Sequence, residues 1–237
     1  MAEPTKLLVF GASGAIGGAV CAAAVARGWD VTAVSRNVKE GAIAGVRSVA
    51  ADPLAEGFSA RTALGVGSYD AVCWAQGANT NDSVYDASVE KNLELYRANC
   101  VYIVASLRAL LSEGLLSNGS RLCVISSIWQ NLARQKKLSY CMTKAALQGL
   151  VLSAAADIAA DGHLINAVLP GALETPMTRK NLTASQIDGL ASATQFGRLA
   201  SLEDVASVVM YLCSRENTGI TGQFIGADLG FSSVRIV

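Results

Sequence analysis

The stretch KLLVFGASGAIGGAV, residues 6–20, joins a short apolar run to an alanine-rich segment through a glycine-rich turn. Gly11 allows a tight turn, Gly14 lets the backbone approach a pyrophosphate, and Gly17 lets a helix pack close to the strand. The N-terminus of that helix would face the phosphates, because its N–H groups are free and carry partial positive charge. The stretch therefore predicts a strand, a dinucleotide-binding turn and a helix in sequence.

Two other motifs do not fit this turn. A phosphate-binding P-loop requires lysine after its last glycine, but Gly18 follows Gly17. A hydrolase nucleophile elbow requires glycine two residues after Ser13, where the chain has Ala15. Ser13 is instead a candidate hydroxyl donor to the dinucleotide.

Short apolar runs alternate with helical segments along the rest of the chain. Strands are expected at residues 6–10, 30–34, 46–51, 69–75, 121–126, 164–169 and 222–227. Helices are expected from the glycine turn to about residue 27 and over residues 86–112, 138–160 and 202–213. The strands are continuous apolar runs, which is typical of parallel strands covered on both faces. The sequence predicts an α/β fold with one domain over residues 1–237: a Rossmann-like, doubly wound parallel sheet of about seven strands with helices on both faces.

Composition argues against several classes of protein. The 237 residues are 51% hydrophobic and carry 19 basic and 19 acidic residues, so no net charge favours nucleic acid or anionic membranes. We expect no signal peptide and no membrane span, because no long uninterrupted apolar run occurs. The cysteines include no CxxC pair, so we expect buried, reduced thiols in a cytoplasmic protein. They are Cys21, Cys73, Cys100, Cys123, Cys141 and Cys213.

The segment YCMTK, residues 140–144, indicates a chemistry that needs no histidine. Tyr140 and Lys144 lie one helical turn apart. A free tyrosine has a pKa of about 10, and a neighbouring cation favours the phenolate and lowers that pKa. The phenol could then exchange a proton with a carbonyl or an alcohol. The single histidine, His163, is expected in a surface loop, so we expect neither a Ser-His-Asp triad nor a metal site.

The end of the second strand, VSRN, indicates which dinucleotide is bound. An NAD site usually ends this strand with an acidic residue that bonds the ribose 2′-hydroxyl. Here Asp30 precedes the strand, whereas Arg36 offers a planar cation suited to a 2′-phosphate. Ser35 and Asn37 could hydrogen-bond the same group. The pattern favours NADP(H) over NAD(H), and the alternative is that Arg36 is a solvated loop residue.

Several motifs follow one another in order along nearly the whole chain: GASGAIG, ISS at the end of the fifth strand, YCMTK thirteen residues later, LPGALETPM, FGRLASLEDVASVVMYLCS and ITGQFIGADLG. In this order and spacing they resemble the single-domain short-chain dehydrogenase/reductases, in particular 3-oxoacyl-acyl-carrier-protein reductases. The resemblance implies an NAD(P)-dependent oxidoreductase. It also implies a homotetramer (or homodimer), with helices around 88–112 and 138–160 forming one interface.

The resemblance assigns a catalytic set. Tyr140 resembles the family's acid/base, and Lys144 resembles the lysine that lowers the tyrosine pKa and binds the nicotinamide ribose. Ser127 resembles the serine that hydrogen-bonds the substrate carbonyl, since the thirteen-residue offset to Tyr140 favours it over Ser126. Asn99 resembles the asparagine that holds a water in the proton relay. The alternative for Asn99 is a helix-kink or capping residue.

Cofactor contacts are assigned in the same way. Pro170 and Gly171 resemble the turn beside the nicotinamide. The backbone of Leu173 and the hydroxyl of Thr175 are expected to bind the carboxamide or phosphates. The other residues expected at the dinucleotide are Ile16, Asp52, Ala75 and Gly77, together with Tyr140 and Lys144.

Three segments depart from the family pattern. The family usually spaces its glycines G-x-x-x-G-x-G, but Ala15 replaces the second glycine here and Gly14 falls one position earlier. WAQG, residues 74–77, stands where the family often has NNAG, so an asparagine that supports the sheet and the adenine side is absent. DLG, residues 228–230, replaces the usual DGG. The departures concern local geometry and cofactor affinity and leave the catalytic set intact.

The resemblance implies that NADPH reduces a ketone or 3-oxoacyl substrate, with Tyr140 as the proton donor. Two alternatives stay open: an alcohol or sugar dehydrogenase working oxidatively, and a catalytically quiet dinucleotide-binding sensor or scaffold.

The substrate pocket is expected between three segments, residues 78–91, 128–139 and 173–197. Trp129 and Leu132 could line it. The basic residues Arg134, Lys136 and Lys137 either attract an anionic substrate or acyl carrier protein, or form a solvated loop. Residues 183–193 are expected to form a helix that closes over the substrate.

Overall fold

Continuous apolar runs form the strands of the computed structural model, which describes residues 3–37, 44–175, 178–179 and 182–234. Within those residues, seven parallel strands form one sheet in the order β3-β2-β1-β4-β5-β6-β7. The strands are β1 (Lys6–Phe10), β2 (Asp30–Ser35), β3 (Val46–Ala50), β4 (Tyr69–Trp74), β5 (Leu116–Ile125), β6 (Leu164–Pro170) and β7 (Phe224–Ala227). The predicted doubly wound parallel sheet is confirmed.

Two strand boundaries differ from the predictions. β5 begins at Leu116, which pairs with Tyr69, five residues earlier than predicted. Polar and small residues interrupt the apolar run between Leu116 and Arg121, so the hydrophobic pattern did not predict this part of the strand. β7 begins at Phe224, two residues later than predicted, and Gly222 before it has a φ of 65°.

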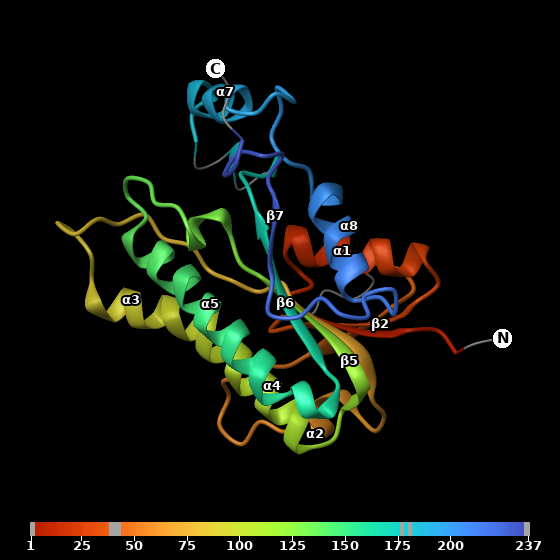
Figure 1. Cartoon of the computed structure of the whole chain (residues 1–237). Coiled ribbons are helices and arrows are strands. Elements are labelled where there is room, and N and C mark those ends of the chain that lie inside the picture. The colour runs from red at the N-terminus through yellow and green to blue at the C-terminus, as the bar shows by residue number, and fades with distance from the viewer. Residues whose placement is uncertain (1–2, 38–43, 176–177, 180–181, 235–237) are drawn as a thin grey trace.

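Helices cover both faces of the sheet (Figure 1). One face carries α1 (Ala15–Ala26) and α8 (Leu202–Leu212), which pack side by side. The other carries α3 (Val89–Tyr96), the π-helical turn η1 (Arg97–Val101), α4 (Tyr102–Ser112) and α5 (Leu138–Asp157). The shorter helices are α2 (Ala60–Leu64), η2 (Ile128–Gln130), η3 (Ala159–Asp161) and α7 (Ala184–Ser192). Each face buries its own apolar cluster against the sheet.

Trp74 explains how the fold tolerates WAQG. Its ring is fully buried, stacks on Phe10 with centroids 5.9 Å apart, and donates from Nε1 to the Ser106 hydroxyl at 2.8 Å. The Tyr102 ring meets the Phe10 ring edge-on. An aromatic cluster thus holds the end of β4 against α4.

Leu229, in the DLG segment, adopts a φ of 57°, which favours glycine. The Asp228 carboxylate accepts the backbone N–H groups of Gly230 at 3.0 Å and Ser232 at 2.9 Å. These bonds hold a turn that the family's usual glycine would adopt more readily.

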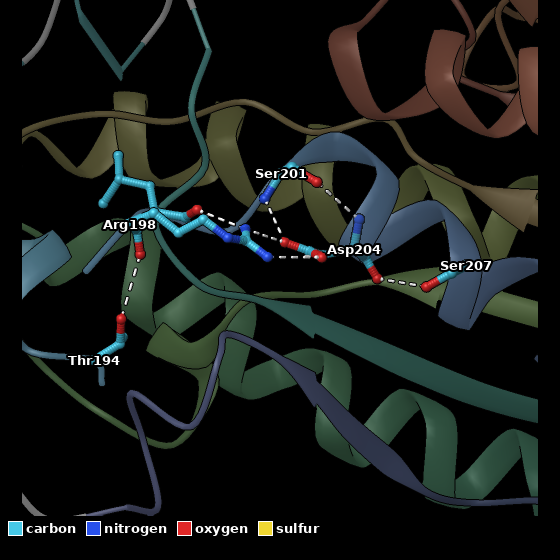
Figure 2. Close-up of polar contacts among 6 residues, drawn as sticks. Thr194, Arg198, Ser201, Asp204 and Ser207 are labelled. Carbon is cyan, nitrogen blue, oxygen red and sulfur yellow. Dashed lines mark hydrogen bonds and ion pairs between the residues drawn. The ribbon is translucent and has the colours of Figure 1, made fainter. Parts of the chain in front are cut away.

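The connection between α7 and α8 is fixed by the polar contacts in Figure 2. The Arg198 guanidinium binds the Asp204 carboxylate at 2.6 Å, and Ser201 caps α8 by accepting the Asp204 N–H at 3.1 Å. The preceding residue, Ala200, bonds through its backbone to Ala172 and Glu174. The cap therefore anchors α8 to the loop that follows β6. The predicted helix over residues 183–193 is present as α7.

Two predictions concern single residue types. All six cysteines are free thiols, and all except the half-buried Cys141 are buried, as predicted. The prediction that His163 lies on the surface is wrong: it is buried, and its Nδ1 accepts the Ser120 N–H at 3.1 Å. The turn before β6 folds this ring onto the polar part of β5. None of the described helices combines the length and the apolarity needed to cross a membrane.

Candidate active site

Backbone atoms pack closely against the glycine turn after β1, both at Gly11 and at Gly17. Gly11 has a φ of 75°, and a Cβ there would lie 2.8 Å from the Ala75 carbonyl carbon. A Cβ on Gly17 would lie 2.8 Å from the Ala12 Cα. Gly14 is the N-cap of α1, and no side chain caps this helix. The first N–H groups of α1 are thus available to an anion, as the sequence predicted.

The residues around this turn accommodate the altered glycine spacing. Ala15, the first residue of α1, is exposed, so its methyl group meets no steric conflict. Ser13 is also exposed, and Ile16 packs against the apolar cluster between α1 and the sheet. A side chain at position 15 is therefore compatible with the turn.

Replacing Gly17 with alanine is expected to lower the free energy of unfolding by about 2 kcal/mol and to weaken dinucleotide binding, because its Cβ would strike backbone atoms. Gly18→Ala is the matched control. A Cβ there would lie 3.7 Å from the Ala12 carbonyl oxygen, an ordinary contact, and alanine favours the helix by up to about 1 kcal/mol. Urea unfolding of both variants measures the difference. Equal stability of the two would contradict this account of the turn.

Charged side chains stand at the carboxyl ends of β2 and β3. Arg36 and Asn37 are exposed, and Ser35 donates to the Asn37 carbonyl at 3.3 Å. Burial raises the pKa of the Tyr102 phenol; Asp52 raises it further and Arg36 lowers it. Both charges therefore lie within electrostatic range of the start of α4. Arg36 presents its cation at the edge of the sheet where the glycine turn lies.

Tyr140, Lys144 and Ser127 come together at the carboxyl end of β5. The Lys144 ammonium donates to the Ile125 carbonyl at 3.0 Å and lies 5.7 Å from the centroid of the Tyr140 ring. The Ser127 side chain lies within hydrogen-bonding reach of the Tyr140 phenol. The Ser126 hydroxyl instead donates to Gln130 Oε1 at 2.8 Å. The local geometry thus brings Ser127, and not Ser126, to Tyr140.

Asn99 lies in the π-helical turn η1 and is buried. Its amide donates to the Ala78 carbonyl at 3.1 Å and to Thr143 Oγ1 at 2.9 Å, while its Oδ1 accepts the Ala78 N–H at 2.7 Å. A Cβ on Gly77 would lie 3.3 Å from Asn99 Oδ1 and 3.8 Å from Lys144 Nζ. Asn99 therefore fixes the loop after β4 beside Lys144.

The pKa of the Tyr140 phenol is not lowered overall, although Lys144 lies one helical turn away. Burial raises the pKa of the Tyr140 phenol above its usual value, and the hydrogen bond with Ser127 only partly offsets this. Burial also lowers the pKa of Lys144 to about 8. The sequence showed the spacing of the two groups but not the desolvation of both, which outweighs their proximity.

Some residues that position this site carry no sequence motif. The buried Asp82 carboxylate accepts the Ser139 N–H at 3.0 Å at the start of α5, one residue before Tyr140. Thr143 holds the Asn99 amide. Lys137 is buried, donates to Asn79 Oδ1 at 2.8 Å and lies 5.6 Å from the Tyr140 ring centroid, so the solvated-loop alternative is wrong for Lys137.

The loop after β6 reaches the same edge of the sheet. Pro170 pairs with Ala227, and a Cβ on Gly171 would lie 2.9 Å from the Asp228 Cβ, so this turn requires glycine. Leu173 bridges to Ala200. The buried Thr175 hydroxyl accepts the Thr178 N–H at 3.2 Å.

A groove of about 570 Å³ is lined in part by the loop that joins Ser127 to Tyr140, and it is large enough for a small substrate. Its described lining contains two cations and no carboxylate, and Arg134 lies 5.8 Å above the centroid of the Trp129 ring. Its walls come from the three predicted segments, although residues 176–177 and 180–181 lie outside the described part. Leu132 instead packs on the apolar core. The lining residues are Asn81, Trp129, Arg134, Gln135, Lys136, Leu182, Gln186, Gly189 and Leu190.

Comparison with known proteins agrees with this geometry. A family model described as Enoyl-(Acyl carrier protein) reductase matches residues 11–232. The chain is 27% identical over 240 residues to the uncharacterized oxidoreductase YmfI of Bacillus subtilis (strain 168), covering 94% of this chain and 97% of that protein. It is 28% identical over 237 residues to the 3-oxoacyl-[acyl-carrier-protein] reductase FabG of Salmonella typhimurium, covering 96% and 97%.

The chain belongs to the short-chain dehydrogenase/reductase family. A gluconate 5-dehydrogenase from Burkholderia cenocepacia J2315, solved in complex with NADP and tartrate, shares the fold with a TM-score of 0.86 at 21% identity, over 98% of this chain and 97% of that one. The resemblance found in the sequence is confirmed. This short-chain dehydrogenase/reductase is an oxidoreductase that uses a nicotinamide dinucleotide and a small-molecule substrate.

The residues of this short-chain dehydrogenase/reductase fit such a cofactor. The uncapped N-terminus of α1, which follows the tight turn that Gly11 and Gly17 permit, suits a pyrophosphate. The backbone at Gly77 lies close to Asn99 Oδ1 and Lys144 Nζ, on the side of the crevice where a ribose and nicotinamide would be held.

Proposed function

We propose that this protein reduces the ketone group of 3-oxoacyl thioesters with NADPH and that Tyr140 donates the proton. The proposal is carried by two observations: Ser127, Tyr140 and Lys144 lie together, and the loop that joins Ser127 to Tyr140 lines a groove whose described lining holds two cations and no carboxylate. A thioester carried on phosphopantetheine, as in acyl carrier protein or coenzyme A, brings negative charge that suits this groove. The relative named as a 3-oxoacyl-[acyl-carrier-protein] reductase supports the same substrate class.

The protein's part in the reaction is to bind and protonate the carbonyl oxygen. When bound, the nicotinamide supplies the hydride to the carbonyl carbon. The hydroxyls of Ser127 and Tyr140 hydrogen-bond the oxygen and stabilise its developing negative charge. Tyr140 then transfers its proton to that oxygen and leaves a neutral alcohol. Burial raises the pKa of the Tyr140 phenol, so the phenol stays protonated at neutral pH, the form that can donate a proton.

Lys144 and Asn99 prepare Tyr140 for the next cycle. The Lys144 ammonium is 5.7 Å from the phenol ring centroid and stabilises the phenolate that the proton transfer leaves. With a pKa of about 8, Lys144 can exchange protons near neutral pH. Asn99 keeps the loop after β4 in place beside Lys144 and, by family resemblance, holds a water in the relay.

An assay of purified protein tests the proposed function. NADPH consumption is followed with a 3-oxoacyl coenzyme A, a 3-oxoacyl carrier protein and a small neutral ketone. We expect the highest kcat/KM for a thioester. Oxidation of alcohols or sugars with NAD, without reduction of any ketone, would overturn the proposal.

Arg36 is proposed to bind the 2′-phosphate of NADPH. Arg36→Ala is expected to weaken NADPH binding about tenfold and to leave NADH binding within about twofold, because only NADPH carries the phosphate that a bidentate guanidinium recognises. The control is Arg27→Ala, which removes an equally exposed cation at the far end of α1. Calorimetric titration gives both affinities. An equal loss for the two coenzymes, or no loss, would contradict this role.

We further propose a homotetramer assembled through the helical face of α3, α4 and α5. This face exposes large apolar side chains, among them Leu93, Val104, Met142 and Leu152. Size-exclusion chromatography with light scattering should give the mass of four chains, and Val104→Glu combined with Leu152→Glu should give a smaller species. A wild-type monomer would rule out the assembly.

A further inference from the structure

Gln76 carries a buried carboxamide that the described fold leaves without a partner. Neither its Nε2 nor its Oε1 has a hydrogen bond within the described part of the chain. A carboxamide offers two donors and an acceptor, and burying all of them unpaired costs stability. Buried polar groups without a hydrogen bond are rare in folded proteins, and each one needs an explanation.

The position of Gln76 in the sheet suggests that reason. Gln76 follows β4, which pairs with β1 at the point where the strand order reverses. In doubly wound sheets, ligands bind in the crevice at this point, beyond the carboxyl ends of the strands. A Cβ on Gly11 would lie 2.5 Å from the Gln76 Cα, so Gln76 lies directly against the glycine turn.

The backbone of Gln76 lies against the glycine turn, which leads to the adenosine side of the crevice. Gly11 donates its N–H to the Val34 carbonyl at 2.9 Å, which links the turn to the end of β2 and to Arg36 beyond it. The next residue, Gly77, lies instead beside Lys144 and Asn99 on the catalytic side. Gln76 thus stands at the boundary, with its backbone against the turn that leads to β2.

We propose that the Gln76 carboxamide hydrogen-bonds the adenosine half of the dinucleotide. A donor and an acceptor on one planar group match the paired hydroxyls of a ribose or the edge of adenine. This contact supplies, from a different position in WAQG, recognition on the adenine side that the missing asparagine of the NNAG pattern would give. The inference rests on the proposed NADPH dependence for its choice of probes.

Gln76→Met tests the contact, because methionine has a similar size and no strong hydrogen-bonding group. The probes are NADPH, adenosine 2′,5′-bisphosphate for one half, and reduced nicotinamide mononucleotide for the other, titrated by calorimetry. We expect about tenfold weaker binding of the first two and unchanged binding of the third. The unfolding temperature of the free variant should be unchanged or raised, because the unpaired group is gone.

Gln223→Met is the matched control, since Gln223 is exposed at the start of β7. Unchanged binding of adenosine 2′,5′-bisphosphate by Gln76→Met would overturn the contact. An equal loss for both halves with a lowered unfolding temperature would also overturn it, because it would show a structural role. Failure of the wild type to bind either NADPH or NADH would overturn the proposed function together with this contact.

Discussion

Tyr140→Phe is expected to lower turnover about a thousandfold and to leave the Kd for NADPH within about twofold. The variant removes one hydroxyl and keeps the ring, which packs between Lys137 and Lys144 with their ammonium groups 5.6 and 5.7 Å from its centroid. The substrate oxygen then loses its proton donor. The Ser127 hydroxyl does not replace it, because an aliphatic hydroxyl is a much weaker acid than a phenol. Stopped-flow hydride transfer and a separate NADPH titration measure the two effects.

Tyr85→Phe is the control for this experiment, because Tyr85 is 96% exposed and is not among the described residues that line the groove. It should keep wild-type turnover. A Tyr140→Phe variant that retained turnover within about threefold would remove Tyr140 from the reaction and would return attention to other proton sources.

Lys144→Met is expected to lower turnover at least a hundredfold without destabilising the protein. Burial lowers the pKa of Lys144 from 10.5 to about 8, so keeping this ammonium charged costs about 3 kcal/mol of folding free energy at pH 7. Methionine removes that cost but also the hydrogen bond to the Ile125 carbonyl. The free energy of unfolding should therefore be unchanged or higher at pH 7.

The pH dependence of the free energy of unfolding tests whether the buried charge of Lys144 destabilises the protein. A lysine whose pKa is depressed by folding weakens the native state fully below its folded pKa and not at all above its unfolded pKa. Wild-type stability should thus gain an increment as pH rises from about 8 to about 10.5, and Lys144→Met should lack that increment. Lys91→Met, on an exposed part of α3, is the control. A strongly destabilised Lys144→Met would contradict the assigned penalty.

The fold was predictable from the sequence because its strands are buried on both faces. Runs such as Lys6–Phe10 and Leu164–Pro170 have few polar interruptions, and the glycine turn fixes the first crossover. The errors came where polar residues continue a strand, as after Leu116, or where a polar ring is folded inward, as at His163. Local pattern does not report such tertiary pairing.

The candidate site was predictable as a set of residues but not as an electrostatic environment. The spacing of Tyr140 and Lys144 placed them on one helix face, and the offset selected Ser127. The desolvation of both titrating groups, the anchoring of α5 by Asp82 and the unpaired carboxamide of Gln76 depend on contacts between distant segments. No short motif encodes these contacts.

The π-helical turn at residues 97–101 sets how the helical segments on its two sides are rotated relative to each other. Such a turn is rare and amounts to one extra residue in an α-helix. Deleting one residue would restore a regular helix and rotate one side of it against the other by about 100°, which would turn Asn99 away from either Ala78 or Thr143. The single extra residue therefore sets the direction in which the Asn99 amide faces, and with it the position of the loop beside Lys144.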